Sequence, residues 1–487
     1  MSEIQRFYEN KTIFLTGGTG FLGKLFVEKI LRSSNPKKIF LLLREKKGKN
    51  PSARLQELFD IPAFSSLTNL KPNYKSLISI IEGDLELVDL GLKQKDKEIL
   101  ESEVNVIIHS GATVRFDENL QKATYINVRS TRDLLILAEK AENLESFVYV
   151  STAFSNCTKQ TIDEKFYQPL ITSENLLKLV DCLDLETLKQ ITPTLLQDNP
   201  NTYVFTKSIA ENQIKDFSKK LPIALIRPSI VVSSYKEPIP GWLDNLFGPT
   251  SILLGACFGL IRALNVDKNA PAEIVPVDFV INSIIAAGYK TAKTQESKIY
   301  NYVSSKQNLI TWENYENLTR KYALKVPSPL VVWHSTLFLI KTRLIFLIYS
   351  FFVQTIPAYV VDFAAKLIGK EPMLVKAYKK IDKFCGAISY FSTKSWKFST
   401  DNTISLWNDL NESDQKLFPF NIESMPWEDF FTNYIKGARV YLMKDPLETI
   451  PAGRRKLKVL KVAHYTLLII FIVIFYKIYT FFYDLIH

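Results

Sequence analysis

A tyrosine and a lysine four residues apart, Tyr203 and Lys207 in TYVFTKSIAEN, are of types and at a spacing that suit catalysis. On a helix, two residues at this spacing share one face. A lysine ammonium beside a phenol lowers the phenol pKa from its usual ~10, so the tyrosine can give its proton to a carbonyl oxygen as hydride reaches the carbon. The alternative is two polar residues on a helix surface, because this spacing also arises by chance.

Two hydroxyl groups precede that pair in the chain. Ser151 and Thr152 end an apolar run at 146–152 that is typical of a buried strand, and both can hydrogen-bond the same carbonyl oxygen. Another apolar run, IALIRPSIV at 223–231, follows the helix of the Tyr–Lys pair, and its Pro228 is assigned to the cofactor site. We therefore predict a catalytic group made of the two hydroxyls, the tyrosine and the lysine.

A glycine-rich turn near the start of the chain, TGGTGFLGK, joins a predicted strand at 12–17 to a predicted helix at 21–33. Glycines in this spacing allow a tight turn and a close approach of the backbone to a pyrophosphate, which the free N–H groups of the helix N-terminus stabilise. A loop without a ligand is the alternative, but the strand–turn–helix context favours a dinucleotide. The residues assigned to this contact are Gly17, Thr19, Gly20, Phe21, Leu22 and Gly23.

The residues after the second predicted strand indicate which dinucleotide is bound. An acidic residue there would hold the ribose 2′-hydroxyl of NADH, whereas this chain has LLLREKKGK, in which Arg44 can pair with a 2′-phosphate. NADPH is therefore the expected cofactor. Arg54 is a second candidate for the phosphate, with a solvated helix residue as the equal alternative. Further contacts are expected after the third and fourth strands, at Asp84, Leu85, Ser110, Gly111 and Ala112.

Short apolar runs alternate with amphipathic segments over the first half of the chain. Apolar strands between helices are typical of a parallel sheet that is covered on both faces. We therefore expect an α/β protein with a Rossmann-type doubly wound parallel sheet, followed by a mainly helical C-terminal domain. The predicted strands are 12–17, 38–44, 77–84, 104–112, 146–152 and 223–231, and two further predicted helices are 21–33 and 131–141.

The predicted domains follow from these patterns. A chain of 487 residues exceeds the usual size of one hydrophobic core. An NADPH-binding catalytic domain is expected over 1–310, with substrate-side segments at 155–200 and 232–275, of which the second begins rich in Pro and Gly. A helical domain is expected over 311–460.

Two apolar segments lie in the second half of the chain. Residues 462–483 provide the ~20 apolar residues that a membrane-spanning helix needs. The basic stretch RRKLKVLK before them favours a cytosolic location for the N-terminal part of the chain. The alternative is a hydrophobic helix packed on the protein, since Lys477 and Asp484 shorten the uncharged stretch. Residues 330–368 fit a second membrane-contacting helix and a core helix pair equally well.

Composition narrows the kinds of partner and site. The chain has 61 Lys+Arg against 50 Asp+Glu, and the net charge of +11 suits a nucleotide, a phosphorylated carrier or an acidic membrane face. Four widely spaced cysteines without a CxxC pair favour a reducing compartment over a disulfide framework or a zinc site. Because only four His are present, none in ligand spacing, we expect no metal, and we expect no nucleic acid as a partner.

These motifs together resemble the extended short-chain dehydrogenase/reductase family and, within it, the alcohol-forming fatty acyl-CoA reductases. The resemblance covers nearly the whole chain, through TGGTGFLGK, LLLREKKGK, HSGATVRF, YVSTAFSN and YVFTKSIAE in family order. IRPSIV, PGWLDNLFGP and IVPVDFVIN are more specific than any generic reductase motif. The departures are GGTG where GATG is frequent and Phe154 where a tyrosine is usual, and neither touches the proposed proton or hydride path.

The resemblance implies NADPH-dependent reduction of a long-chain acyl-CoA to a primary alcohol through an aldehyde. It places Tyr203 and Thr152 at the carbonyl oxygen and Lys207 on the nicotinamide ribose. The implied partners are the acyl-CoA and a membrane reached through the C-terminal anchor, and a homo-oligomer stays open. We expect the catalytic part to face the cytosol at the endoplasmic reticulum, with the peroxisomal membrane as the alternative. The rival functions are an aldehyde-forming reductase, a sterol- or sugar-nucleotide-acting relative, and a non-catalytic membrane-tethered NADPH-binding scaffold.

Overall fold

The computed structural model describes residues 2–486, with side chains described as far as residue 484. The chain divides into two compact units, and each unit gathers segments that are distant in sequence. The first comprises Met1–Trp242, Glu273–Ile310 and Ser395–Pro426, and the second comprises Leu243–Ala272, Thr311–Lys394 and Trp427–His487. A division at residue 310 would put residues 243–272 in the first unit and residues 395–426 in the second. In the structure, residues 243–272 pack in the second unit and residues 395–426 pack in the first.

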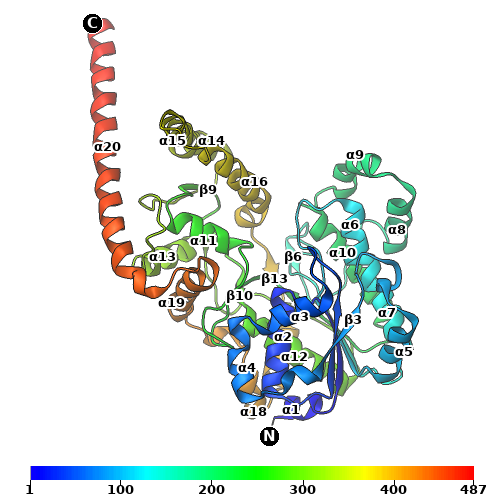
Figure 1. Ribbon diagram of the computed structural model, residues 1–487. Coiled ribbons are helices and arrows are strands. Elements are labelled where there is room, and N and C mark those ends of the chain that lie inside the picture. Colours follow the sequence, from blue (N-terminus) through cyan, green and yellow to red (C-terminus); the bar gives the residue numbers. More distant parts are fainter. Residues whose placement is uncertain (1, 487) are drawn as a thin grey trace. The chain divides into compact units, whose positions relative to one another are not determined.

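A parallel sheet of seven strands forms the centre of the first unit (Figure 1). Its strands are β1 (Thr12–Thr16), β2 (Lys38–Leu43), β3 (Ile78–Glu82), β4 (Val106–His109), β5 (Ser146–Val150), β7 (Ile223–Pro228) and β11 (Lys298–Tyr302). They are ordered β11-β7-β5-β4-β1-β2-β3, so the chain starts inside the sheet, moves to one edge and returns to build the other side. Every pairing is parallel, which confirms the predicted doubly wound sheet.

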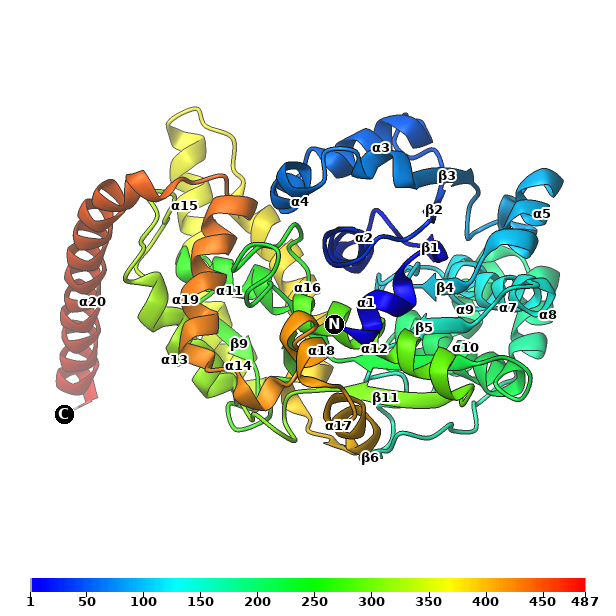
Figure 2. The same cartoon turned by 90° about the horizontal axis from the view of Figure 1, so that it is seen from below.

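Helices cover both faces of this sheet, with α2 and α12 on one face and α5, α7 and α10 on the other (Figures 1 and 2). Because both faces are covered, β1, β5 and β7 are buried along their whole length and are mainly apolar in the sequence, with Arg227 of β7 as the one charged residue among them. The helices of the first unit are α1 (Glu3–Tyr8), α2 (Phe21–Ser33), α3 (Pro51–Phe59), α4 (Ser65–Leu70), α5 (Gln94–Glu103), α6 (Leu120–Thr124), α7 (Ser130–Lys140), α8 (Ser173–Cys182), α9 (Leu185–Leu196), α10 (Thr202–Phe217), α12 (Val277–Thr294), α17 (Asp401–Asn408) and α18 (Glu412–Leu417).

The edge strand β11 was not among the predicted strands. Its sequence, KIYNY, mixes aromatic and polar residues and lacks the aliphatic run of the inner strands. The late segment 395–426 joins the sheet unit at this edge, because α17 packs on β11 and a short strand pairs back to an earlier loop. The short parallel pairs of the first unit are β6 (Thr161–Ile162) with β13 (Lys397–Phe398) and β8 (Ile230–Val232) with β10 (Ile274–Pro276).

The second unit is mainly helical, as predicted for the C-terminal part. A short parallel pair, β9 with β12, carries a small core of Ile261, Leu264 and Val266. Its elements are α11 (Pro249–Cys257), β9 (Ala263–Asn265), α13 (Trp312–Ala323), β12 (Phe338–Ile340), α14 (Arg343–Ser350), the π-helical turn η5 (Phe351–Thr355), α15 (Ile356–Leu367), α16 (Leu374–Thr393), α19 (Trp427–Gly437) and α20 (Ile450–Ile486).

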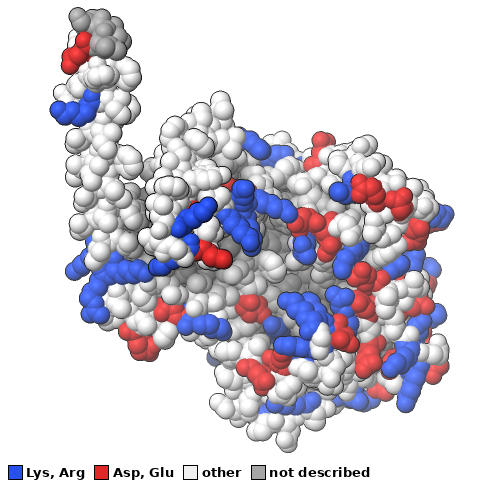
Figure 3. Space-filling view, turned by 45° about the horizontal axis from the view of Figure 1, so that its top comes forward, with Lys and Arg blue, Asp and Glu red and all other residues white. Residues whose placement is uncertain are grey.

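The C-terminal helix α20 is long and apolar enough to cross a membrane. Within the candidate span Leu447–Asp484 the most apolar window of 18 residues has a mean hydropathy of 2.2, and none of that window is buried within the described chain. The alternative of a helix packed on the protein is therefore not what the structure shows. Figure 3 shows an almost uncharged surface along this helix, with basic side chains gathered where it begins. In a second candidate span, Arg343–Leu367, the most apolar window of 18 residues has a mean hydropathy of 1.9.

Candidate active site

The glycine turn between β1 and α2 leaves no room for side chains at two positions. Gly17 has a φ of 75°, and a Cβ there would come within 2.7 Å of the Gly111 nitrogen. A Cβ at Gly23 would lie 2.2 Å from the Gly17 carbonyl oxygen. Gly20 precedes α2 without a side-chain cap, so the first N–H groups of that helix stay available to a ligand. This backbone cradle at a helix N-terminus fits a pyrophosphate.

Basic side chains gather beside this turn. Arg54 reaches from α3 to donate to Thr19 Oγ1 at 2.6 Å and to the Arg44 carbonyl at 2.8 Å. Arg44 donates to Asp84 Oδ2 at 2.8 Å. Burial and the neighbouring Arg44 charge lower the pKa of Arg54, and burial followed by the Arg54 charge lowers that of Lys46. Because these cations disfavour one another, an anion such as a 2′-phosphate would stabilise the cluster.

The loop after β4 lies directly against the glycine turn. Ser110 Oγ donates to the Thr16 carbonyl at 2.9 Å, and the Gly111 nitrogen donates to Thr16 Oγ1 at 3.1 Å. A Cβ on Gly111 would come within 2.6 Å of Leu85 Cδ1, so the loops after β3 and β4 also meet. The chain continues from this contact into Ala112. The structure thus brings the predicted residues of three strand ends together.

The other cofactor residues predicted from sequence lie around the same strand ends. Phe21 and Leu22 open α2, and the Phe21 ring stacks on Trp242 with centroids 5.8 Å apart. Pro228 is the last residue of β7, and its carbonyl accepts a hydrogen bond from the Ala153 nitrogen at 2.9 Å. That bond fixes the end of β7 against the chain that leaves β5.

Tyr203 and Lys207 lie one turn apart on α10, whose start is held by the Asn201 side chain as N-cap. Lys207 is only 2% exposed, and its Nζ donates to the Val150 carbonyl at 2.8 Å. Tyr203 as a whole is partly exposed, whereas its phenol oxygen is buried beside Thr152. The predicted tyrosine, lysine and threonine therefore meet at the carboxyl end of β5.

The protonation of the Tyr–Lys pair differs from the sequence-based expectation. Burial raises the pKa of Tyr203 to about 12, the Glu211 charge adds to this rise, and the Thr152 hydrogen bond opposes it. Burial lowers the pKa of Lys207 to about 7, against the opposing effect of Glu211. The expected lowering of the phenol pKa by Lys207 is therefore wrong for this structure, because burial dominates. The phenol keeps its proton at neutral pH, as a general acid must.

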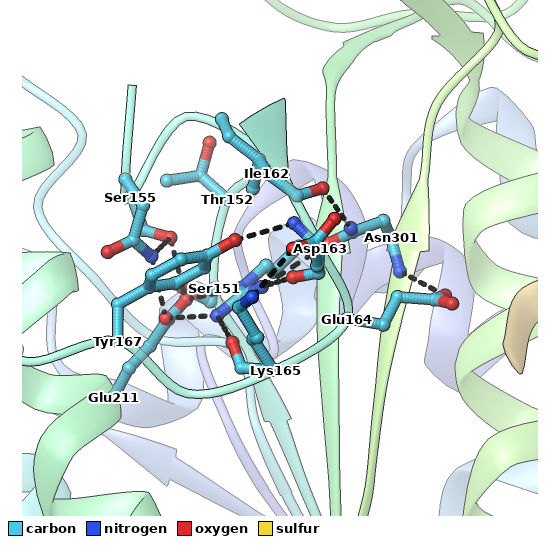
Figure 4. A network of polar contacts seen from close by, with 12 residues as sticks. Ser151, Thr152, Ser155, Ile162, Asp163, Glu164, Lys165, Tyr167, Glu211 and Asn301 are labelled. Carbon is cyan, nitrogen blue, oxygen red and sulfur yellow. Dashed lines mark hydrogen bonds and ion pairs between the residues drawn. The ribbon is translucent and has the colours of Figure 1, made fainter. Parts of the chain in front are cut away.

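Ser151, predicted to be catalytic, is engaged elsewhere. Its hydroxyl donates to Glu211 Oε1 at 2.5 Å, and the Ser155 hydroxyl donates to the same oxygen at 2.8 Å (Figure 4). Arg227, which is fully buried, donates to both carboxylate oxygens of Glu211 at 3.0 and 2.7 Å. Of the two predicted hydroxyls, Thr152 meets the tyrosine and Ser151 meets this carboxylate. Sequence reasoning missed Glu211, although it lies four residues after Lys207 on the same helix face.

Comparisons with known proteins identify the family. The model NAD_binding_4, described as "Male sterility protein", matches residues 15–284, and a second model with the same description, Sterile, matches residues 353–445. Fatty acyl-CoA reductase wat of Drosophila melanogaster is 39% identical over 96% of this chain and 91% of its own length. Fatty acyl-CoA reductase 1 of Rattus norvegicus is 35% identical, over 98% of this chain and 94% of its own. The chain belongs to the fatty acyl-CoA reductase family.

Solved structures agree with the fold of this fatty acyl-CoA reductase. The reductase domain of a nonribosomal peptide synthetase from Mycobacterium tuberculosis has a TM-score of 0.58 at 18% identity, over 89% of this chain and 92% of that one. The terminal R domain of the myxalamid PKS-NRPS pathway has a TM-score of 0.57 at 18% identity, over 89% and 91%. At this identity the likeness concerns the fold, which is that of NAD(P)-binding reductases.

Proposed function

We propose that this fatty acyl-CoA reductase uses NADPH to reduce a long-chain acyl-CoA to the primary alcohol, in two reductions at one centre. The observation that carries the proposal is the contact of Tyr203 with Thr152 beside the buried Lys207, at the carboxyl end of β5 and on the same edge of the sheet as the glycine turn after β1. Since the acid, its hydrogen-bonding partner and the dinucleotide cradle lie at neighbouring strand ends, a carbonyl can meet both a proton donor and the cofactor.

The residues present fit NADPH. The glycine turn and the N-terminus of α2 would hold the pyrophosphate, and Arg44 with Arg54 would hold the 2′-phosphate. Lys207 would hold the hydroxyls of the nicotinamide ribose. When bound, the cofactor supplies hydride to the carbonyl carbon. The cationic cluster at Arg44, Lys46 and Arg54 supports NADPH over NADH, because NADH has no phosphate to place there.

The protein side chains act on the carbonyl oxygen. In the first reduction Thr152 hydrogen-bonds the oxygen of the thioester and Tyr203 gives it a proton, so negative charge does not accumulate there. The hydroxyl of the resulting hemithioacetal then loses its proton as the carbon–sulfur bond breaks, and a proton leaves with the sulfur as the CoA thiol, so that an aldehyde remains. The aldehyde presents a carbonyl oxygen of the same kind, so the same two side chains serve the second reduction. Solvent returns a proton to Tyr203 after each reduction.

Membrane attachment through α20 suits both ends of this reaction, since a long acyl chain and a fatty alcohol partition into lipid. The basic stretch before the apolar part of α20 supports an orientation with the catalytic part in the cytosol. We place the enzyme at the endoplasmic reticulum, with the peroxisomal membrane as the alternative.

The proposal is tested by following a labelled long-chain acyl-CoA with the purified full chain and NADPH. We expect labelled alcohol as the final product, and a transient aldehyde that a carbonyl trap intercepts. The Tyr203→Phe variant should lose turnover by about 10²-fold or more, the usual contribution of a general acid, with unchanged NADPH binding. Tyr125→Phe, which removes a phenol on η4 (Tyr125–Arg129), is the matched control. Aldehyde as the end product would overturn the alcohol-forming part, and an undiminished Tyr203→Phe rate would overturn the acid.

A further inference from the structure

The helix pair α14–α15 of the second unit turns its large apolar side chains outward. Its buried positions are Ser350, Gln354 and Ala358, spaced four residues apart along one face. Exposed positions include Leu344, Ile348, Phe352, Tyr359, Val360 and Phe363, each more than half exposed. A surface helix in water has the reverse arrangement, with its apolar stripe against the core. Such an inverted pattern is expected of a helix whose outer face meets a medium, such as lipid, that is less polar than the protein surface on which its inner face packs.

The inward face is firmly attached to its own unit. Gln354 Oε1 accepts hydrogen bonds from the backbone nitrogens of Arg262 at 2.8 Å and Ala263 at 3.3 Å. Its Nε2 donates to Ser350 Oγ at 2.7 Å. Only 17% of the most apolar window of Arg343–Leu367 is buried within the described chain. The polar face is thus fixed by the protein, and rotation of the helix to hide its apolar face would break these bonds.

Both ends of this segment return to the same small sheet. Before α14, β12 pairs with β9, and at the end of α16 the Ser392 carbonyl accepts a hydrogen bond from the Asp267 nitrogen at 3.0 Å, directly after β9. At the far end, Asp362 accepts hydrogen bonds from the first backbone nitrogens of α16, including Leu374 at 2.9 Å. We call α14–α16 (343–393) the apolar hairpin. Because it leaves and re-enters one side of the unit, it cannot cross a bilayer without bringing α16 back through it.

The returning helix α16 carries a basic stripe. Lys376, Lys379, Lys380 and Lys383 follow the i, i+3, i+4, i+7 spacing that places residues on one helix face, and all four are exposed. Four such charges do not enter a hydrocarbon core, so α16 cannot be a membrane-spanning partner of α15. A lysine stripe beside an apolar face is the composition of a helix that lies in the headgroup region of an anionic leaflet.

We propose that the apolar hairpin is a second, one-sided membrane contact that recognises anionic phospholipid. The outward side chains of α14–α15 enter the acyl region of one leaflet, and the lysine stripe of α16 binds the phosphate and carboxylate groups of the headgroups. In Figure 1 the hairpin and α20 rise from the same side of the second unit, so one bilayer can hold both. The contact is independent of the reductase chemistry, so its failure leaves the proposed function untouched.

The test places an environment-sensitive fluorophore on the hairpin of the full chain in vesicles. A background with Cys182→Ser, Cys257→Ser and Cys385→Ser leaves only the buried Cys157 among the native cysteines. Val360→Cys carries the probe. Leu324→Cys, in the same unit and similarly exposed, is the matched control.

We expect the Val360 probe to shift to the blue and to be quenched by spin-labelled lipid, and the Leu324 probe to do neither. Quenching at Val360 should be stronger in phosphatidylcholine vesicles that contain phosphatidylserine. Reversal of Lys379, Lys380 and Lys383 to Glu should abolish that dependence, whereas reversal of Lys95, Lys140 and Lys219 of the first unit should preserve it. An unshifted Val360 probe would overturn the proposal. So would a shifted probe that lipid does not quench, because a second copy of the chain would then cover the face.

Discussion

Burial shapes the chemistry of Lys207 more than any neighbour does. The ammonium is almost fully enclosed at the end of β5, and its pKa falls from 10.5 to about 7. Below pH ~7 the folded and the unfolded chain both hold this proton; between pH ~7 and ~10.5 only the unfolded chain holds it. Raising the pH through this window therefore favours the folded state. The charge that we propose for cofactor binding thus destabilises the folded protein near neutrality.

Lys207→Met should separate these two effects. We expect the variant to lose cofactor binding and turnover but to unfold at a higher denaturant concentration than the parent at pH 7. Since each pKa unit corresponds to ~1.4 kcal/mol, the stability advantage should shrink by roughly 2 kcal/mol between pH 7 and 9. Urea unfolding of both proteins across this range measures it. An advantage that is independent of pH would contradict the low pKa.

Arg54 gives a prediction for cofactor choice. Its guanidinium lies at the glycine turn, where it donates hydrogen bonds to Thr19 Oγ1 and to the Arg44 carbonyl. The alternative, a solvated helix residue, is not what the structure shows. Loss of a hydrogen bond to a charged group costs about 1.5–3 kcal/mol, so Arg54→Ala should weaken NADPH binding by roughly 10- to 100-fold. NADH binding should change little. Titration of the two reduced cofactors by their fluorescence measures both constants, with the exposed Lys37→Ala as the control, and equal weakening of the two would contradict a 2′-phosphate contact.

Residue identity was predictable at this site and protonation was not. The sequence order of glycine turn, Ser151–Thr152 and the Tyr–Lys pair sufficed to place Tyr203 with Thr152. The pKa values depend on burial by β5 and on Glu211, and burial is a property of the packed sheet that no local spacing reports. The same cause explains Ser151, whose hydroxyl is taken up by the buried Glu211 carboxylate, a partner that its adjacency to Thr152 in sequence does not reveal.

At the scale of elements, the Glu211–Arg227 ion pair joins α10 to β7. Both side chains are nearly or fully buried, and Glu211 also accepts hydrogen bonds from Ser151 and Ser155 after β5. One carboxylate thus connects the helix that carries Tyr203 to the two strands beside it. Because the pair is enclosed, removing one partner leaves an uncompensated charge.

Glu211→Gln should therefore destabilise the protein by about 3–5 kcal/mol, the usual effect of breaking a buried ion pair. The same change at Glu174, an exposed carboxylate on α8 paired with Lys178, should leave the stability nearly unchanged, because solvent screens an exposed ion pair. Chemical denaturation of the two variants measures the contrast. A Glu211→Gln variant as stable as Glu174→Gln would show that the network does not hold α10 in place.

Elements were predictable where one local pattern decides them. Short, mainly apolar runs located six strands, because the inner strands of a parallel sheet are buried on both faces. β11 was not predicted from the sequence, because an edge strand needs fewer apolar residues than an inner strand and KIYNY has no aliphatic run. The segment 395–426 was assigned to the helical part by its position in the chain, yet β13 pairs with β6 more than two hundred residues earlier. Pairing over such a distance leaves no periodicity in either partner.

At the scale of the whole molecule, the charges around α20 make a prediction about orientation. Arg454, Arg455, Lys456, Lys458 and Lys461 precede its apolar part, and only Lys477 and Asp484 carry charge in the rest of the described helix. Flanking basic residues stay on the cytosolic side of a membrane during insertion. The catalytic part should therefore be digested by protease added to intact microsomes, and a glycosylation acceptor fused after residue 487 should be modified in the lumen. Reversal of the first four basic residues to Glu should reduce that glycosylation, whereas reversal of four exposed lysines of the first unit should leave it unchanged.

Glycosylation that survives the reversal would mean that the flanking charges do not set the orientation. An unglycosylated parent would mean that α20 lies on the membrane without crossing it.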